Sequence, residues 1–235
     1  LNPCESTQVA MVVQNPTGPP WAASDVATVT ARSATRPDLS VSVVRHTRTP
    51  APLLRVDDDR WYDVGDAHRQ ALLDIGLPFD NWYVQGVASL GPSRSPPFET
   101  LRMYPMVIWF SGYDWYEPLN AEDEAALGRY LDGGGRVAYS GQDYLSASEE
   151  ISEFARDRLG VLDYTEDVTN THVVGVITSP LGSWIRPEEL VYPYRNFSDV
   201  LTPTASADVA FVNQEGQPIA LTHAKPDWRT AFFAF

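Results

Sequence analysis

The sequence is poor in cysteine and in positive charge. Cys4 is its only cysteine, which excludes an internal disulfide and a metal site built from several cysteines. Lys225 is its only lysine, and 17 basic residues stand against 31 acidic ones, for a formal net charge of −14. A chain this acidic repels phosphate backbones and anionic headgroups. We therefore expect neither nucleic acid nor an anionic membrane surface as a partner.

Long apolar runs are also missing. No stretch of about eighteen apolar residues occurs, so no membrane insertion is expected. The sequence has no initiator methionine and no segment with a basic start and an apolar middle that would direct secretion. It starts at Leu1 in a strand-like region and stops at Phe235 in an apolar run. This indicates an internal piece of a longer polypeptide or a processed product.

The composition nevertheless predicts a folded protein. Hydrophobic residues make up 43% of the 235 residues and aromatic residues 11%, which argues against disorder. The length suits one large domain, or one full domain with a fragment of another.

Residues 1–50 have the texture of β-strands. The segments 8–13, 25–31 and 39–47 are rich in β-branched residues, and the last two alternate with small polar residues, as strands with one solvated face do. Turn-rich sequence separates the three segments. Three short strands cannot close a sandwich core alone. A β-arm that packs on the following domain is the alternative interpretation.

From residue 51 onward, strands and helices alternate. Apolar runs at 52–56, 79–84, 106–110 and 136–140 predict four parallel strands in the order 2-1-3-4, with helices on both faces. Beyond Val161 several more strands follow, which we expect to be antiparallel at one edge. The predicted fold class is α/β: a flavodoxin-like, doubly wound, mostly parallel sheet with extra C-terminal strands, preceded by the N-terminal β segment.

Helix signals support this alternation. Asn120 should cap one helix, which the glycines at 133–135 should end. Ser146 and Glu149 form a capping box for a later helix that should end at Gly160. An earlier helix should bury a stripe of apolar side chains, which are Val64, Ala67, Ala71, Leu72 and Ile75.

The first region resembles a known module. Its segments NPCES (2–6), ASD (23–25) and TVTARS (28–33) are similar to segments in the last strands of bacterial immunoglobulin-like domains, which are common in secreted multidomain proteins. The resemblance implies that residues 1–50 are a partial immunoglobulin-like sandwich.

The second region carries an ordered set of motifs. They are RVDDD (55–59), VIWFSGYDW (107–115), the block 118–143 with YLDGGGR and SGQD, FARDRLGV (154–161) and SDVLTPTASADVAF (198–211). In this set, residues 51–235 resemble the class I glutamine amidotransferase-like domains of secreted bacterial multidomain proteins such as extracellular peptidases. The resemblance implies a flavodoxin-like accessory domain that is extracellular or lies at the cell surface.

The catalytic residues of that family are missing. Its enzymes use a cysteine at the turn after the fourth strand and a later His-x-Glu, but here the turn reads YSGQD (139–143), and Lys225 stands two residues after His223. Ser140 as a nucleophile needs a nearby base, and no histidine stands in a recognisable context. We therefore expect a pseudoenzyme. The alternative is a hydrolase or amidotransferase-like enzyme that uses Ser140 and Asp143.

Acidic residues follow three of the four predicted strands. The run 57–59 follows the first strand, Asp114 the third and Asp143 the fourth, and in a doubly wound sheet these strand ends meet at one crevice. Clustered carboxylates repel unless arginine, a cation or raised pKa values relieve them. Arg55 and Arg60 are the nearest cations in sequence. We favour helix caps and exposure to water as the explanation, with no cofactor.

A bound Ca²⁺ is the sharper alternative for this crevice. Its ligands would be the carboxylates of Asp57, Asp58 and Asp143, because Ca²⁺ prefers oxygen ligands. The candidate ligand-binding residues of the crevice as a whole are Asp57, Asp58, Asp114, Trp115, Gln142 and Asp143. The aromatic pairs 61–62 and 115–116 either form a platform for sugar or peptide, or cover the end of the sheet, which we favour.

The sequence therefore predicts a non-catalytic accessory or interaction domain of a secreted multidomain protein or extracellular assembly. Its partners would be other domains or chains of that assembly. A carbohydrate- or peptide-binding module is a further alternative. A base within hydrogen-bond reach of Ser140 or Asp143 would favour an enzyme, and an open turn without one would favour a binding domain.

Overall fold

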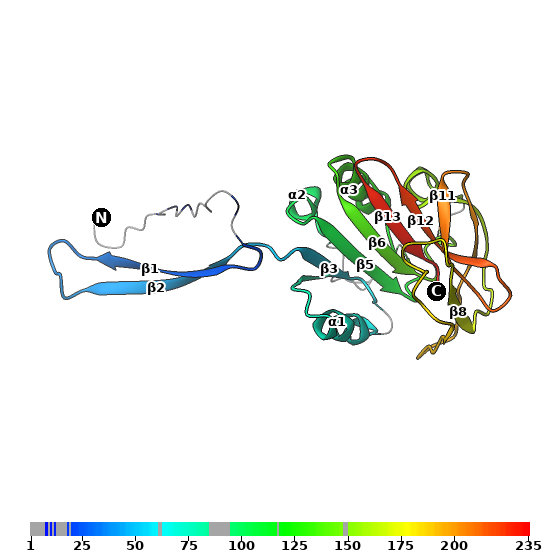
Figure 1. The fold of residues 1–235 in the computed structure, drawn as a ribbon. Coiled ribbons are helices and arrows are strands. Elements are labelled where there is room, and N and C mark those ends of the chain that lie inside the picture. The colour runs from blue at the N-terminus through cyan, green and yellow to red at the C-terminus, as the bar shows by residue number, and fades with distance from the viewer. Residues whose placement is uncertain are drawn as a thin grey trace. The chain divides into compact units, whose positions relative to one another are not determined.

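The computed structural model describes residues 20–60, 63–84, 95–116, 118–147 and 150–235, together with residues 8, 10, 12 and 18. The chain divides into two compact units, residues 1–51 and 52–235 (Figure 1). The boundary expected between residues 50 and 51 lies one residue from this division.

The first unit contains a two-stranded ribbon. Strand β1 (Ser24–Arg32) pairs antiparallel with β2 (Ser40–Arg48), with Val29 opposite Val43. The side chains on both faces of the ribbon are mostly exposed. Two of the three predicted strands are therefore confirmed. The third, at 8–13, lies largely outside the described residues, and the immunoglobulin-like sandwich stays a prediction.

The second unit is a mixed α/β domain built on a nine-stranded sheet with the order β4-β3-β5-β6-β13-β12-β11-β8-β9. The pairs from β4 to β13 are parallel and the remaining pairs are antiparallel. The bounds are β3 Leu53–Asp57, β4 Asp80–Tyr83, β5 Met106–Gly112, β6 Arg136–Gly141, β8 His172–Gly175, β9 Glu188–Glu189, β11 Ala207–Val212, β12 Pro218–Ala224 and β13 Arg229–Phe233. Strands β7 (Val161–Thr165) and β10 (Val200–Pro203) form a separate antiparallel pair.

The four predicted strands have the predicted order and are parallel, as β4-β3-β5-β6. The expectation of an antiparallel tail is right for β12, β11, β8 and β9 and wrong for β13. The chain turns back after β12, so β13 inserts between β12 and β6 and runs parallel to β6. The neighbour that a strand takes in the sheet depends on which strand edge the rest of the fold leaves free. The residue pattern within one strand does not predict this.

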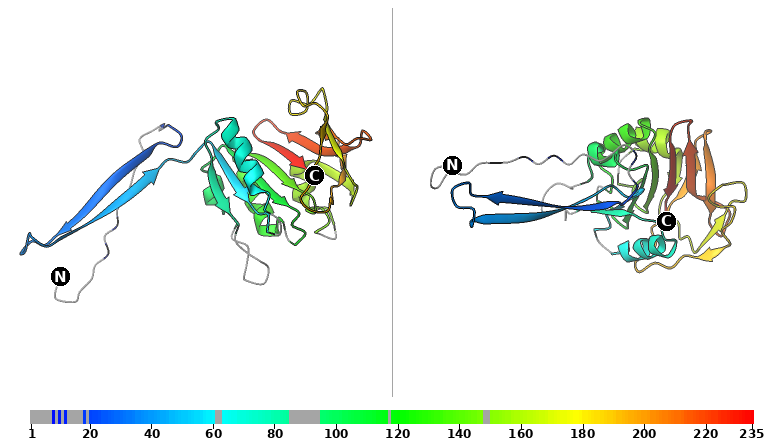
Figure 2. Two further views of the ribbon diagram at one scale, coloured as in Figure 1. Left: turned by 90° about the horizontal axis from the view of Figure 1, so that it is seen from below. Right: turned by 60° about the vertical axis from the view of Figure 1, so that its left-hand side comes forward.

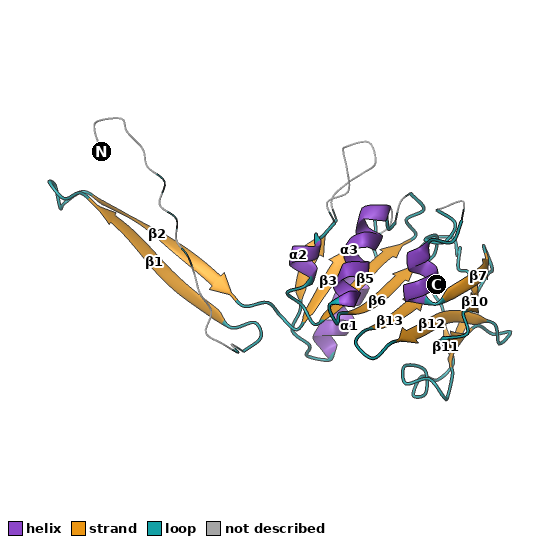
Figure 3. Cartoon of the chain, turned by 90° about the horizontal axis from the view of Figure 1, so that it is seen from above, coloured by secondary structure: helices purple, strands orange, loops and turns teal. Residues whose placement is uncertain are grey.

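Helices cover both faces of the parallel strands (Figures 1 and 2). α1 (Gly65–Asp74) lies on one face, while α2 (Phe98–Leu101), α3 (Ala121–Asp132) and the π-helix η1 (Ala155–Leu159) lie on the other (Figure 3). Helix content is low for a doubly wound fold. None of the helices in the described part of the chain is long and apolar enough to span a bilayer.

The sequence determines α3 locally. The Asn120 side chain accepts hydrogen bonds from the backbone N–H groups of Glu122 and Asp123, and the Asp123 side chain accepts one from the Asn120 N–H. This capping box satisfies N–H groups that a helix start leaves without partners. The inner side chains of α3 pack with Trp109 of β5 in the main core, and they are Leu127, Tyr130 and Leu131.

Two local expectations are wrong. In α1, Leu72 is buried but Ile75 is 72% exposed, because the helix turns the half-buried His68 rather than an apolar stripe toward the sheet. Ser146 does not cap the later helix: its hydroxyl donates to the Asp143 carbonyl oxygen, while Ser152 accepts the Ala155 N–H. Gly160 ends that helix with φ of +81°, as expected.

Candidate functional site

The predicted acidic side chains do lie at the carboxyl ends of β3, β5 and β6, but they form three separate groups. Each group has its own hydrogen-bonding partners among the described residues. Among the described residues, no set of three His, Cys, Asp or Glu side chains is placed to hold a metal ion. The arrangement therefore gives no support to a Ca²⁺ site made by Asp57, Asp58 and Asp143.

The first group centres on Arg60. Its Nε lies 3.4 Å from Oδ1 of Asp58 and 3.0 Å from Oδ2 of Asp114. Asp58 also accepts a 3.1 Å hydrogen bond from the indole N–H of Trp109. Both carboxyls are only 1% exposed, so the expectation that they extend into water is wrong. Burial raises the pKa of Asp58, and Arg60 opposes this rise. This group is a buried part of the scaffold rather than a ligand site.

The second group centres on Arg55, which is also 1% exposed. Its guanidinium pairs with Asp57 at 2.8 Å and donates to Oδ1 of Asn81 at 3.0 Å. A side chain at position 65 would meet this guanidinium, because an added Cβ would lie 2.6 Å from Nη2 of Arg55. Gly65 therefore allows α1 to begin directly against the ion pair.

Asp59 completes the second group. It accepts a hydrogen bond from the N–H of Val64, the residue before α1, while α1 itself has no side-chain cap, so the cap expected from Asp57 is wrong. Burial, together with the neighbouring Asp57 carboxyl, raises the pKa of Asp59 to about 7. Arg55, Asp57 and Asp59 line a polar pocket of about 400 Å³.

The third group follows β6. Gln142 is 1% exposed and its side-chain oxygen accepts the Phe197 N–H at 2.9 Å. Burial raises the pKa of Asp143 to about 6, and it raises the pKa of the 1% exposed Asp199 to about 8, helped by the charge of Asp143. One oxygen of each of these two carboxyls has no hydrogen-bond partner in the described part of the chain. At neutral pH Asp199 is therefore mostly protonated.

Ser140 does not have the geometry of a nucleophile elbow. Such elbows hold the nucleophile on a strained turn between a strand and a helix. Ser140 lies within β6, between Phe110 of β5 and Phe233 of β13, and its φ is not positive. Turns follow up to residue 147, and the next described helical turn begins only at Glu153.

An aromatic pocket of about 360 Å³ opens over Ser140 on the α1 face of the sheet. Its walls come from α1, from the ends of β5 and β6, from the loop 191–194 and from the C-terminal residue. The aromatic side chains that line it are His68, Phe110, Tyr192, Tyr194 and Phe235. We call this the aromatic pocket.

Stacking contacts fix the aromatic pocket. The His68 ring lies parallel to Phe110 with their centroids 4.0 Å apart, and Arg55 lies over Phe110 at 4.7 Å. Tyr194 stacks on Tyr113 at 5.2 Å and contacts Tyr192 at 6.0 Å. Burial, followed by the charge of Arg55, lowers the pKa of His68 to about 4. His68 is therefore neutral at physiological pH.

Ser140 and His68 line the same pocket but are not joined. In the part of the chain that the structure describes, no hydrogen bond links the Ser140 hydroxyl to a histidine or a carboxylate. The His68 ring is held flat against Phe110. The pocket thus has the rings and polar groups of a binding site without a formed nucleophile and base.

Solved structures with a similar fold include two β-galactosidases. A GH42 β-galactosidase from G. stearothermophilus matches with a TM-score of 0.54 and 13% identity over 79% of this chain. A cold-adapted β-galactosidase from Rahnella sp. R3 matches with a TM-score of 0.52 and 16% identity over 80%. This chain corresponds to only 27% and 29% of their lengths.

A ThuA-like protein from Bacteroides uniformis is less similar, with a TM-score of 0.47 and 11% identity over 78% of this chain and 80% of that protein. No family model matches the chain, and no curated protein sequence does. The likeness to the two β-galactosidases shows a similar fold alone.

Of the candidate site residues named from the sequence, the described lining of the aromatic pocket includes only Ser140. Asp57 lines the polar pocket, Asp58, Asp114 and Gln142 are buried with partners, and Trp115 is 54% exposed. The pair 61–62 lies outside the described residues. The sequence analysis missed the loop 191–194 as a wall of the aromatic pocket. A signal for it is present, because the segment VYPYRNF (191–197) contains three aromatic residues.

Proposed function

We propose that the second unit is a non-catalytic binding domain and that a saccharide occupies the aromatic pocket. The observation that carries this proposal is the aromatic wall around Ser140 without a base bonded to it. A sugar ring offers C–H groups to aromatic faces and hydroxyls to polar groups, and this pocket offers both kinds of partner.

The polar pocket supports the same proposal. Asp63 lines both pockets, so the carboxylates of Asp57 and Asp59, which line the polar pocket, lie next to the aromatic walls. Planar groups of this kind form paired hydrogen bonds with neighbouring hydroxyls. A saccharide of more than one unit would use the aromatic pocket for one ring and the polar pocket for the next.

The proposal also covers the type of domain and the larger assembly to which it belongs. The ordered motifs and the strand order support a flavodoxin-like domain of the class I glutamine amidotransferase-like type, acting as an accessory part of an extracellular assembly. The similar structures are named β-galactosidases, which makes galactosides sensible first ligands to test.

A second candidate function is a hydrolase that uses Ser140. It is favoured by one observation: His68 lines the same pocket and is neutral at physiological pH, so one of its ring nitrogens can accept a proton. His68 would have to leave its stack on Phe110 to take the Ser140 proton. This candidate predicts ester or glycoside turnover that disappears in Ser140→Ala.

Calorimetric titration of the full chain with galactose, lactose and cellobiose tests the first candidate. Tyr192→Ala removes one ring from the aromatic pocket and should weaken binding roughly threefold to tenfold. Trp184→Ala is the matched control, because Trp184 is 89% exposed and does not line the pocket. Equal affinity in the two variants would contradict the proposal.

A further inference from the structure

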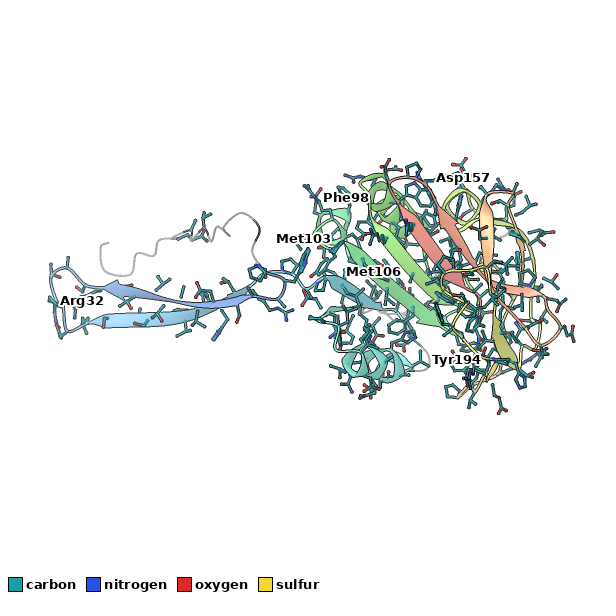
Figure 4. All side chains as sticks on the ribbon, viewed as in Figure 1. Arg32, Phe98, Met103, Met106, Asp157 and Tyr194 are labelled. Carbon is teal, nitrogen blue, oxygen red and sulfur yellow. The ribbon has the colours of Figure 1, made fainter. Side chains whose placement is uncertain are left out.

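A separate pocket of about 490 Å³ lies at the other edge of the parallel strands, where they begin. Figure 4 shows Asp157 of this edge and Tyr194 of the aromatic pocket at opposite ends of the sheet. We call it the basic pocket. It is lined by Arg156, Asp157, Arg158, Thr204, Ser206, His223, Lys225 and Trp228.

The charge of the basic pocket is opposite to that of the chain. It holds three permanent cations against the single acid Asp157, in a chain with a net charge of −14. Lys225 is the only lysine of the sequence. Among the described residues, neither Arg156 nor Lys225 forms an ion pair, whereas Arg158 pairs with Asp132 at 2.7 Å. Two cations are thus available to a ligand.

His223 forms the inner wall of the basic pocket and is 3% exposed. Its Nε2 lies 3.1 Å from the Ser206 hydroxyl, and its ring meets Trp228 edge-on at 5.2 Å. Burial, followed by the charge of Lys225, lowers its pKa, although the Arg158 backbone opposes this. Its buried Nδ1 has no hydrogen-bond partner among the residues that the structure describes. This wall is therefore neutral and polar, and one ring nitrogen of His223 can still form a hydrogen bond.

Two hydroxyl groups line the basic pocket beside the buried histidine. The hydroxyls of Thr204 and Ser206 lie 3.5 Å apart in the loop before β11. Trp228 presents an aromatic ring, over which Arg158 lies at 5.2 Å. Cationic side chains, hydroxyl donors and a ring in one pocket are the partners of a small molecule that carries an oxyanion.

We propose that the basic pocket binds a compact oxyanion group of a small molecule, with Arg156 and Lys225 as its charge partners. The hydroxyls of Ser206 and Thr204 donate hydrogen bonds to it, and Trp228 contacts the apolar part of the ligand. Phosphate, sulfate and carboxylate share this chemistry. A polyanion is excluded because the acidic surface outside the pocket repels an extended chain of charges. This site is independent of the aromatic pocket.

The full chain is titrated with inorganic phosphate, sulfate and acetate at constant ionic strength, with chloride as the balancing anion. We expect saturable binding of at least one of the three anions. The anion that binds with the highest affinity identifies the type of oxyanion that the pocket prefers. The proposal would be overturned if none of the three anions bound at concentrations up to about 50 mM. A Kd of that size corresponds to a binding free energy near −2 kcal/mol.

Variants locate the bound anion. Lys225→Gln and Arg156→Gln should each weaken binding roughly threefold to fivefold, as the loss of one solvent-exposed charge partner does. Ser206→Ala should weaken it without a change in charge. Arg102→Gln, an exposed arginine paired with Glu99 outside the pocket, is the control. An equal loss of affinity in Arg102→Gln would show that only general electrostatics acts, and would overturn the proposal.

Discussion

At the scale of single residues, buried charge distinguishes the scaffold from the candidate sites. Arg60 is shared by two buried carboxyls, Asp58 and Asp114, and has its own side chain only 7% exposed. Among the described residues, Asp143 and Asp199 form no ion pair, and burial raises the pKa of both carboxyls, to about 6 and about 8, so that Asp199 holds a proton at neutral pH. Two similar carboxyl pairs are thus stabilised in different ways at one end of the sheet.

Removing the shared cation should be costly. Arg60→Met leaves two buried carboxyls without their ion-pair partner, and we expect it to lower the free energy of unfolding by about 3–5 kcal/mol. Arg69→Met is the control, because Arg69 pairs with the exposed Asp66 and should cost at most about 1 kcal/mol. Chemical denaturation of both variants measures the difference, and equal stability would refute the role given to Arg60.

Asp199 should make stability depend on pH. Its pKa is about 8 in the folded protein and about 3.9 in an unfolded chain, so the folded state holds the extra proton between these values. The free energy of unfolding should therefore fall as pH rises from about 4 to about 8.

Asp199→Asn imitates the protonated carboxyl and should flatten this dependence. Even one pKa unit of the shift corresponds to about 1.4 kcal/mol, so the variant should be more stable than the wild type at pH 8 by at least that amount. Asp208→Asn, an exposed position on β11, serves as the control. A slope that Asp199→Asn leaves unchanged would contradict this account.

At the scale of elements, the features that depend on neighbouring residues in the sequence could be predicted. The features that depend on contacts between distant segments could not. The cap at Asn120, the stop at Gly160 and the four parallel strands follow from residues within one segment. The parallel entry of β13 beside β6 and the stacking of His68 on Phe110 depend on distant neighbours. The aromatic pocket was missed for the same reason, since Phe110 and Tyr192 come together only in the folded chain.

The start of α3 gives a prediction at this scale. Asn120→Ala removes an acceptor for two backbone N–H groups and should lower the free energy of unfolding by about 1 kcal/mol. Asn120→Gly keeps the backbone conformation of a cap and should cost only a few tenths of a kcal/mol. Thermal denaturation that ranks glycine below alanine would refute the capping role.

At the scale of the whole molecule, the two units differ in how they are stabilised. The second has a large hydrophobic core and a smaller cluster of buried side chains from β8, β11 and β12, whereas the described part of the first is a ribbon with mostly exposed side chains. Isolated two-stranded ribbons are marginally stable in water. The second unit should therefore fold without the first.

A chain of residues 52–235 tests this. We expect it to unfold cooperatively with a melting temperature within about 2 °C of the main transition of the full chain, because a loss of 1 kcal/mol would already shift a domain of this size by about 2–4 °C. Calorimetry of the two chains makes the comparison. A large drop would show that residues 1–51 contribute to the core.

The central claim is that the aromatic pocket binds a saccharide without transforming it. A crystal structure of the chain soaked with the best-binding saccharide tests this most directly, in the wild type and in Ser140→Ala. The account predicts an intact sugar against Tyr192 in the aromatic pocket of both. A sugar bound elsewhere, or one cleaved in the wild type and intact only in Ser140→Ala, would contradict it.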